Sequence, residues 1–231
     1  MIHTPEALPV AAMPGSESAG HRRRRVRWPA GTVIFDEGDL DTCLYVIHDG
    51  RVRVGLNRNT DRECLVHVLG PGEIFGEESV FDPGPRTTCA VAITDAVATR
   101  IDRREVISTM AGQPEMAQRF LRIIARRIRS TSSTITDTVY ASVAARVAKQ
   151  LLGLAQRFGV QERGAMRVPM DLTQEQFAHL VGSSRESVNK ALCDFAARGW
   201  IVVARDSIVI RESEPLAARM HGARRPHVAA R

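Results

Sequence analysis

The chain has 231 residues, of which 44% are hydrophobic and 25% are charged, and its formal net charge is +6. This length is enough for two domains that each bury a core, and the composition is that of a globular protein. No hydrophobic run is long enough to cross a membrane, and the N-terminus lacks a charged segment followed by an apolar one. We therefore expect a cytoplasmic protein with no membrane partner.

The charge is distributed unevenly along the chain. Residues 28–112 carry 8 basic and 14 acidic side chains, whereas residues 141–231 carry 14 basic and 8 acidic ones. A basic surface favours nucleic acid, so the C-terminal half is expected to face that partner.

The cysteines carry no metal-binding signature. They lack Cys-x-x-Cys spacing, which argues against zinc or an iron–sulfur cluster, so we expect reduced, buried thiols and no metal. The four are Cys43, Cys64, Cys89 and Cys193.

Residues 1–20 mix Pro, Gly, Ser and Ala without periodicity, and residues 1–27 are predicted to form a disordered, arginine-rich tail. The tail ends in an arginine-rich stretch that includes Arg22–Arg25. A run of like charge is typically solvated, although it could touch DNA phosphates without sequence specificity.

From Trp28 to Ile101, short apolar or alternating runs are separated by turn residues. Many short strands at regular spacing predict a small antiparallel roll or barrel. The expected strands are Thr32–Phe35, Leu44–Ile47, Arg51–Val54, Cys64–Leu69, Glu73–Phe75, Thr88–Ile93 and Ala96–Ile101.

A loop between two of these strands has the chemistry of an anion site. Gly76 opens a predicted helical turn, whose free backbone N–H groups suit a phosphate. Arg86 and Thr87 would return to the same place with a guanidinium fork and a hydroxyl donor. These three residues are therefore candidates for a phosphate clamp.

Two carboxylates follow Gly76 directly. Glu77 would repel a phosphate, but it could bind a ribose hydroxyl, and Glu78 belongs to the same candidate set. One alternative is a surface loop with an Arg86–Glu77 ion pair. Another is a hydrolase that uses both carboxylates. Neighbours on one helical turn point apart, and no nucleophile–base pair accompanies them, so the sequence disfavours an enzyme.

Residues 113–140 predict a long helix with one apolar seam. Hydrophobic residues recur at spacings of three and four from Met116 to Val139, and the simplest partner for this seam is the same helix of a second copy. Thr131 interrupts the seam and is followed by Ser132. Hydroxyls there cost stability unless they are hydrogen-bonded, although a polar residue can also simply set the register.

Capping residues delimit the shorter helices. Asp102 is the expected N-cap of a helix that ends at Gly112. Ser142 is expected to cap a helix that ends at Gly159, which places an interdomain hinge near Val139–Ser142.

A helix-turn-helix is predicted within residues 141–214. Two capping boxes, Thr173-x-x-Gln176 and Ser183-x-x-Glu186, flank a turn at Gly182. The second helix buries one stripe and exposes an opposite face. Arginine can read guanine and glutamate can accept from cytosine, although a solvated salt-bridged face is the alternative. The exposed face consists of Arg185, Glu186, Asn189 and Lys190.

The chain ends with a predicted wing and tail. Trp200–Ala204 and Ser207–Ile210 should pair as a hairpin around Arg205-Asp206. Residues 215–231 are expected to form a loosely ordered basic tail.

Three of these motifs resemble the cyclic-AMP receptor protein family, the Crp/Fnr superfamily, and most closely its actinobacterial branch. The stretch from Gly76 to Thr88 is similar to the family's phosphate-binding cassette, and Gly182–Val188 is similar to its recognition helix. Ala125–Ile128, with Thr131 and Ser132 after it, resembles its dimerisation helix.

The resemblance implies an α+β fold in three parts. They are an N-terminal antiparallel, jelly-roll-like β-roll that binds cyclic nucleotide (28–112), a long central dimerisation helix (113–140) and a C-terminal winged helix-turn-helix that binds DNA (141–214).

For the effector, the resemblance implies cyclic AMP acting allosterically. Thr131 would bond the adenine amino group in its own subunit, and Ser132 would reach the nucleotide held by the other subunit. Another nucleotide, or no ligand, combined with the same DNA-binding output is the alternative.

For the output, the resemblance implies a homodimeric transcription regulator on palindromic DNA with TGTGA-like half-sites, and RNA polymerase as a further partner. Arg185, Glu186 and Lys190 would read base edges, with Asn189 at an adjoining position. Thr173 and Ser184 would contact phosphates.

Overall fold

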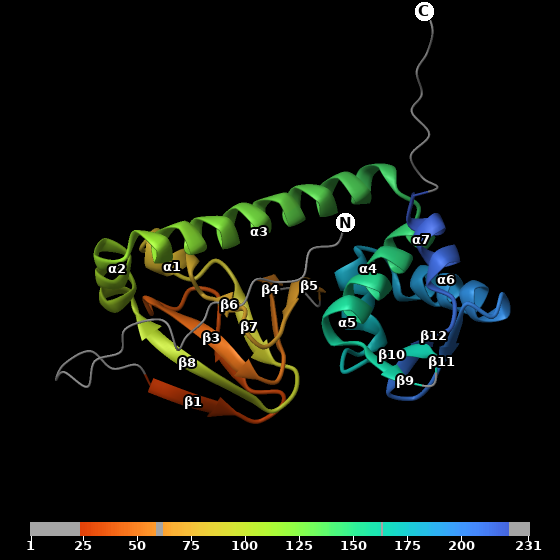
Figure 1. Cartoon of the computed structure of the whole chain (residues 1–231), viewed down its shortest axis with the longest axis horizontal. Coiled ribbons are helices and arrows are strands. Elements are labelled where there is room, and N and C mark those ends of the chain that lie inside the picture. Colours follow the sequence, from red (N-terminus) through yellow and green to blue (C-terminus); the bar gives the residue numbers. More distant parts are fainter. Residues whose placement is uncertain (1–23, 59–61, 163, 222–231) are drawn as a thin grey trace, which may run out of the picture. The chain divides into compact units, whose positions relative to one another are not determined.

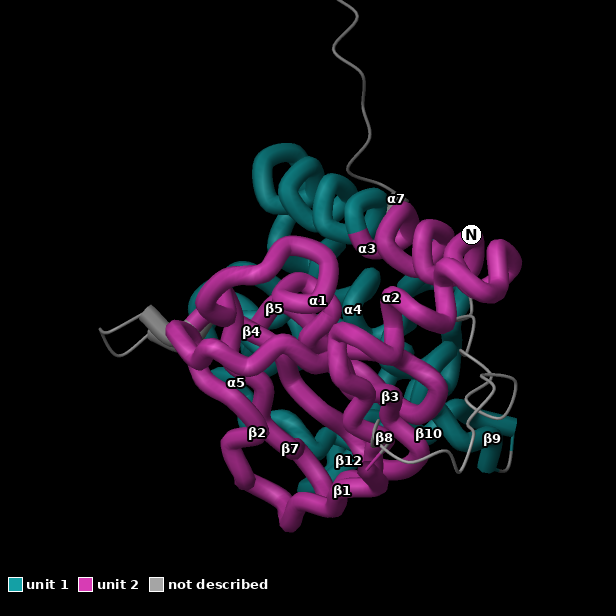
Figure 2. The backbone as a smooth tube through the Cα atoms, turned by 90° about the vertical axis from the view of Figure 1, so that its left-hand side faces the viewer, with its two compact units in different colours: residues 1–4, 128–231 teal, residues 5–127 magenta. Residues whose placement is uncertain are grey.

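The computed structural model describes residues 24–58, 62–162 and 164–221. The chain divides into two compact units, one of residues 5–127 and the other of residues 128–231 together with 1–4. The division falls inside the long helix α3 (Pro114–Tyr140), and Figure 2 colours the two units separately.

The first unit is an antiparallel β-roll of two four-stranded sheets, as predicted (Figure 1). One sheet has the order β1-β8-β3-β6 and the other the order β2-β7-β4-β5. The strands are β1 (Arg24–Trp28), β2 (Val33–Phe35), β3 (Cys43–Asp49), β4 (Val52–Arg58), β5 (Arg62–Leu69), β6 (Ile74–Phe75), β7 (Cys89–Ala92) and β8 (Ala96–Asp102).

Strand β3 is buried on both faces and lies between two apolar clusters. Its Tyr45 stacks on Phe75 of the neighbouring strand β6, with ring centroids 4.9 Å apart, and packs towards residues of the second sheet such as Phe35. Its Leu44 and Val46 face the opposite way, into a cluster with Phe120 of α3. Side chains alternate across a strand, so a continuous apolar run of this kind predicts burial on both sides. The second cluster is completed by α1 (Glu78–Phe81) and α2 (Arg103–Gly112).

Strand β1 corrects the expected extent of the N-terminal tail. Arg24–Arg27 was predicted to belong to that tail, but these residues pair with β8, in a register that joins Arg24 to Arg100 and Trp28 to Ala96. Val26 and Trp28 pack against the core, while the three arginines of the strand are exposed. The arginine run obscured this alternation in the sequence. Arg22 and Arg23 lie outside the described residues.

The second unit is a winged helix-turn-helix, as predicted. Helix α4 (Val143–Phe158) supplies much of its core, and the four-stranded sheet has the order β11-β12-β10-β9. The remaining elements are β9 (Val160–Glu162), β10 (Ala165–Pro169), α5 (Gln174–Val181), α6 (Arg185–Ala197), β11 (Ile201–Val203), β12 (Ser207–Ile210) and α7 (Ser213–His221).

The observed N-caps match the predicted ones for some helices and differ for others. Thr173 forms the predicted capping box with Gln176, and Ser142 caps α4. The second predicted box is wrong, because Ser184, not Ser183, caps α6 by accepting from the Ser187 N–H. Asp102 occupies the N-cap position of α2 but makes no capping bond, since its carboxylate pairs with Arg100.

Helix α7 corrects the predicted loose tail after Pro215. Residues 213–221 are helical, and Leu216 is fully buried on a helix that packs against α4. Pro215 is the third residue of the helix, where a proline removes no intrahelical hydrogen bond. Residues 222–231 of the predicted tail lie outside the described part.

The expectation of buried thiols is confirmed for Cys43 and Cys89, but Cys193 is exposed. The side chain of Cys64 lies outside the described residues. Within the described ranges, no helix is long and apolar enough to span a bilayer.

Core burial of β3 gives a stability prediction. Val46 is 0% exposed and Val33 is 57% exposed, so Val46→Ala should lower the free energy of unfolding of this unit by about 2 kcal/mol and Val33→Ala by about 0.5 kcal/mol. The measurement is urea unfolding followed by Trp28 fluorescence in a Trp200→Phe background, since the chain has 2 tryptophans. Equal losses for the two variants would contradict the two-sided burial of β3.

Candidate functional site

The candidate site in the first unit begins at a glycine. Any other residue at this position would force neighbouring atoms to move. Gly76 has φ +76°, in the left-handed region, and a Cβ there would lie 2.6 Å from Arg86 Nη1 and 3.2 Å from the Cys43 carbonyl oxygen. Helix α1 follows, with Glu77 at its N-cap position. Glycine therefore allows the backbone to approach the guanidinium closely.

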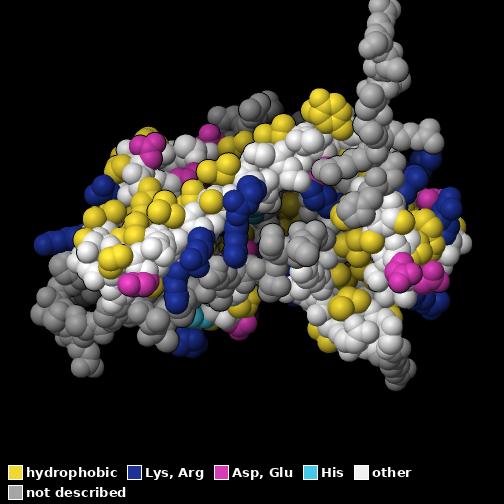
Figure 3. Space-filling view, turned by 45° about the horizontal axis from the view of Figure 1, so that its top comes forward, with side chains coloured by type: hydrophobic (Ala, Val, Ile, Leu, Met, Phe, Trp, Pro, Cys, Tyr) yellow, Lys and Arg dark blue, Asp and Glu magenta, His cyan; other side chains and the backbone are white. Residues whose placement is uncertain are grey.

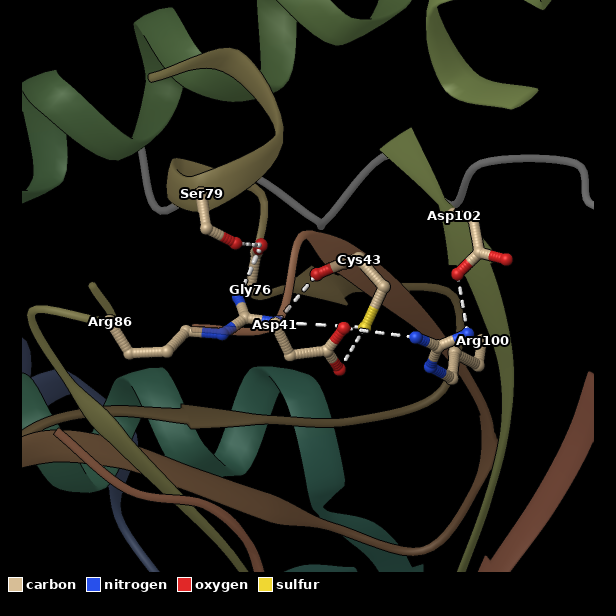
Figure 4. Close-up of polar contacts among 7 residues, drawn as sticks. All are labelled: Asp41, Cys43, Gly76, Ser79, Arg86, Arg100 and Asp102. Carbon is tan, nitrogen blue, oxygen red and sulfur yellow. Dashed lines mark hydrogen bonds and ion pairs between the residues drawn. The ribbon is translucent and has the colours of Figure 1, made fainter. Parts of the chain in front are cut away.

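Arg86 is a buried cation, 4% exposed. Its Nη1 donates to the Gly76 carbonyl at 2.6 Å and its Nη2 to the Cys43 carbonyl at 2.7 Å, as Figure 4 shows. The guanidinium lies over the Phe35 ring, 4.2 Å from its centroid. Its Nε has no hydrogen-bond partner, and no carboxylate pairs with it among the described residues. A buried charge of this kind is costly unless an anion compensates it.

A chain of polar residues from β3, from β8 and from the segment just before β3 lies beside Arg86 (Figure 4). The Cys43 thiol donates to Asp41 at 2.9 Å, and Arg100 pairs with both Asp41 and Asp102. Burial raises the pKa of Cys43 to about 11, and the bond to Asp41 adds to this. Burial would also raise the pKa of Asp41, but the Cys43 hydrogen bond and Arg100 outweigh it, so that pKa is lowered. The thiol is thus a neutral group with its proton directed away from the guanidinium.

Glu77 is also buried, at 2% exposed, and it is paired with Arg127 of α3. The alternative of an exposed loop with an Arg86–Glu77 pair is therefore wrong. Arg127 also donates to the Ile74 carbonyl at 2.9 Å. The other carboxylate oxygen, Oε2, is buried without a partner among the described residues.

Arg127 is the site residue that the sequence analysis missed. Two signals pointed to it: it lies in the Ala125–Ile128 segment that resembles the family's dimerisation helix, and it stands four residues, or one helical turn, before Thr131.

Thr87 and Glu78, the other two candidates of the loop, lie at its surface and bond to each other. The Thr87 hydroxyl donates to Glu78 Oε2 at 2.5 Å, and both side chains are exposed. The loop therefore presents an inner pair of buried charges, Arg86 and Glu77, and an outer pair of exposed groups. The two unpartnered buried atoms, Arg86 Nε and Glu77 Oε2, fit a ligand that offers both an anion and a hydroxyl donor.

Thr131 and Ser132 belong to the second unit and are exposed on α3. Their side chains have no hydrogen bond among the described residues. In contrast, the hydroxyls of Thr134, Thr136 and Thr138 each donate to the carbonyl four residues earlier, at 2.9–3.1 Å. Such local bonding satisfies a helical hydroxyl without any partner. Thr131 and Ser132 therefore remain available to one.

The apolar seam of α3 continues beyond the residues that pack on the roll. Ile128, Ile135 and Val139 are 61%, 62% and 66% exposed, and Figure 3 shows hydrophobic side chains at the surface along this helix. Large apolar residues exposed along one face of a helix usually mark a surface that another protein covers.

The candidate DNA-reading residues have the disposition that the sequence predicted. Helix α6 buries Val188, Ala191, Leu192 and Phe195 and exposes Arg185, Glu186 and Lys190, with Asn189 partly exposed beside them. The hydroxyl oxygens of Thr173 and Ser184 accept the capping N–H of their own helices. Each candidate phosphate contact is thus fixed at the first turn of α5 or α6.

Comparisons with known proteins agree with this arrangement. The profile of the cyclic nucleotide-binding domain matches residues 25–113, and that of the Crp-like helix-turn-helix domain matches residues 145–228. The CRP-like cAMP-activated global transcriptional regulator of Mycobacterium tuberculosis (strain H37Rv) is 50% identical over 194 residues, which are 84% of this chain and 87% of that protein. The cyclic AMP receptor protein of Thermus thermophilus is 30% identical over 190 residues, 82% of this chain and 85% of that protein.

Solved structures share the fold. A mutant CooA from Carboxydothermus hydrogenoformans matches with a TM-score of 0.75 at 18% identity, covering 94% of this chain and 97% of that one. A CRP-family transcriptional regulator of Thermus thermophilus matches with a TM-score of 0.72 at 27% identity, covering 86% of this chain and 97% of that one. The Mycobacterium tuberculosis relative and the 27% identical Thermus thermophilus structure are both named as transcriptional regulators, not as enzymes. The chain belongs to the Crp/Fnr family of transcription regulators.

Proposed function

We propose that the protein is a cyclic-AMP-responsive regulator that acts as a homodimer on palindromic DNA. The observation that carries the effector half is the buried guanidinium of Arg86, which has no carboxylate partner among the described residues. A cyclic phosphate would supply the missing negative charge, and the ribose 2′-hydroxyl would donate to the unpaired Oε2 of Glu77. The name of the Mycobacterium tuberculosis relative, a cAMP-activated regulator, supports the same ligand.

In this proposal, three successive segments of the chain have different roles. Residues 28–112, with β1 added in front, hold the nucleotide, residues 113–140 form the dimerisation helix and residues 141–214 bind DNA. Thr131 and Ser132 would close over the base, so that one ligand contacts both the roll and the central helix. The effector can shift the DNA-binding equilibrium only by its differential affinity for the two arrangements.

The proposed output is reading of TGTGA-like half-sites by two copies of α6. Arg185, Glu186 and Lys190 would contact base edges, Asn189 would lie beside them, and Thr173 and Ser184 would contact phosphates. In a two-fold dimer the recognition helices must lie about 34–36 Å apart to enter successive major grooves. RNA polymerase is the proposed further partner.

DNA titration with and without cyclic AMP tests the whole proposal. We expect saturating cyclic AMP to increase affinity for a labelled duplex with inverted TGTGA half-sites about 5- to 150-fold, measured by fluorescence anisotropy. Arg86→Gln should abolish this increase because the phosphate loses its buried cation, whereas Arg104→Gln, at an exposed arginine of α2, should retain it. Circular dichroism of both variants checks that they fold. Cyclic AMP without effect on DNA affinity or thermal stability of the wild type would refute the effector.

Thr131→Ala should weaken cyclic AMP binding about 3- to 10-fold, because one neutral hydrogen bond to the base is lost. The measurement is isothermal titration calorimetry. Thr134→Ala is the matched control, since the Thr134 hydroxyl is satisfied by the Ser130 carbonyl, and it should leave the affinity unchanged. Equal effects of the two variants would argue against a contact at Thr131. Parallel titration with cyclic GMP tests the alternative effector.

Ile135→Glu should convert the dimer to a monomer in sedimentation velocity, because a charge in the exposed apolar row of α3 cannot be desolvated between two helices. Ile107→Glu, on an exposed position of α2, should leave the dimer intact. A wild type that sediments as a monomer at micromolar concentration would exclude the proposed dimer.

A further inference from the structure

The side chain of Gln174 links the two helices of the helix-turn-helix. Its Oε1 accepts from Arg185 Nε at 3.0 Å and from Asn189 Nδ2 at 3.4 Å. Gln174 is the first residue of α5, and its two partners stand one turn apart on α6. The contact therefore joins the start of one helix to the exposed face of the other.

The chemistry of the neighbours fixes which end of the amide faces them. Arginine Nε and asparagine Nδ2 are both donors, so the facing atom must be the acceptor Oε1. The Nε2 of Gln174 then points elsewhere and has no hydrogen bond among the described residues. The backbone that carries Gln174 is rigid, because the Thr173 capping box ties the first turn of α5 together.

Occupation of Nε has a consequence for base reading. An arginine that recognises guanine in the major groove presents two parallel donors to O6 and N7. Because Nε donates to Gln174, the two terminal nitrogens of Arg185 remain free to donate to a base. The bond at Nε also fixes the plane of the guanidinium. An unheld arginine would lose more rotamer freedom on binding any base.

We propose that Gln174 is a positioning residue for sequence reading, which orients the Arg185 guanidinium, and with it Asn189, towards a guanine. This inference rests on the proposed DNA-binding function of α6. It differs from a plain phosphate contact by Gln174, because loss of a phosphate contact weakens binding about equally on every sequence. Loss of a positioning contact instead lowers discrimination at one base pair.

The test uses the full-length protein with saturating cyclic AMP and a panel of labelled duplexes. In the panel, each G·C pair of the TGTGA half-sites is replaced in turn by A·T, symmetrically in both half-sites. The position whose penalty disappears in Arg185→Ala is the one that Arg185 reads. At that position we expect Gln174→Ala to lose about 3- to 10-fold of the wild-type discrimination, with the penalties at the other positions unchanged.

Two further variants sharpen the result. In an Arg185→Ala background, Gln174→Ala should have no additional effect on discrimination, because the group that it positions is gone. Gln161→Ala is the matched control, since Gln161 is an exposed glutamine of β9 in the same unit, and it should behave as wild type at every position.

The outcomes separate the two claims. A uniform loss for Gln174→Ala on all duplexes, or no loss, while Arg185→Ala still erases one penalty, would overturn the positioning role alone. A wild type with equal affinity for all duplexes would overturn the proposed DNA reading and the positioning role together. A position-specific loss that vanishes in the double variant would establish the role.

Discussion

The site of the first unit depends on one interaction, the burial of a permanently charged arginine against carbonyl oxygens and an aromatic ring. The guanidinium of an arginine stays charged inside proteins, so burying Arg86 is costly unless its neighbours compensate the charge. Two backbone carbonyls and the Phe35 face are only partial compensation for a full charge. The roll therefore holds a cation whose best partner is an anion from outside.

The surroundings of Arg86 explain why the cation keeps one position. Gly76 has a positive φ and leaves no room for a Cβ beside Nη1. The Cys43 carbonyl belongs to a strand that is buried on both faces, so it cannot move without disturbing two apolar clusters. The acceptors are thus as rigid as the core itself, and a ligand would meet an oriented fork rather than a mobile side chain.

Much of this could be predicted from the sequence, because it follows from local patterns. Strands with apolar alternation, the capping box at Thr173 and the stripe of α6 all depend on residues close together in the chain. The features that were missed depend on distant partners. Arg127 meets Glu77 across 50 positions of sequence, and no periodicity marks it. Strand β1 was hidden because its exposed arginines dominate the pattern, although Val26 and Trp28 supply the inward face.

The hydroxyls of α3 fall into two groups that differ in their hydrogen bonds. Thr134, Thr136 and Thr138 satisfy themselves within the helix and need nothing else. Thr131 and Ser132 make no such bond within the described residues, although they are also hydroxyl residues on the same helix. An exposed hydroxyl is hydrated at little cost, so the helix is stable without a ligand. Under the proposed function, the base of the nucleotide replaces the water around these hydroxyls only when Arg86 already holds the phosphate. The binding energy for closing the helix over the nucleotide then comes from the roll, and the small contribution of each hydroxyl decides which base is accepted rather than whether a nucleotide binds.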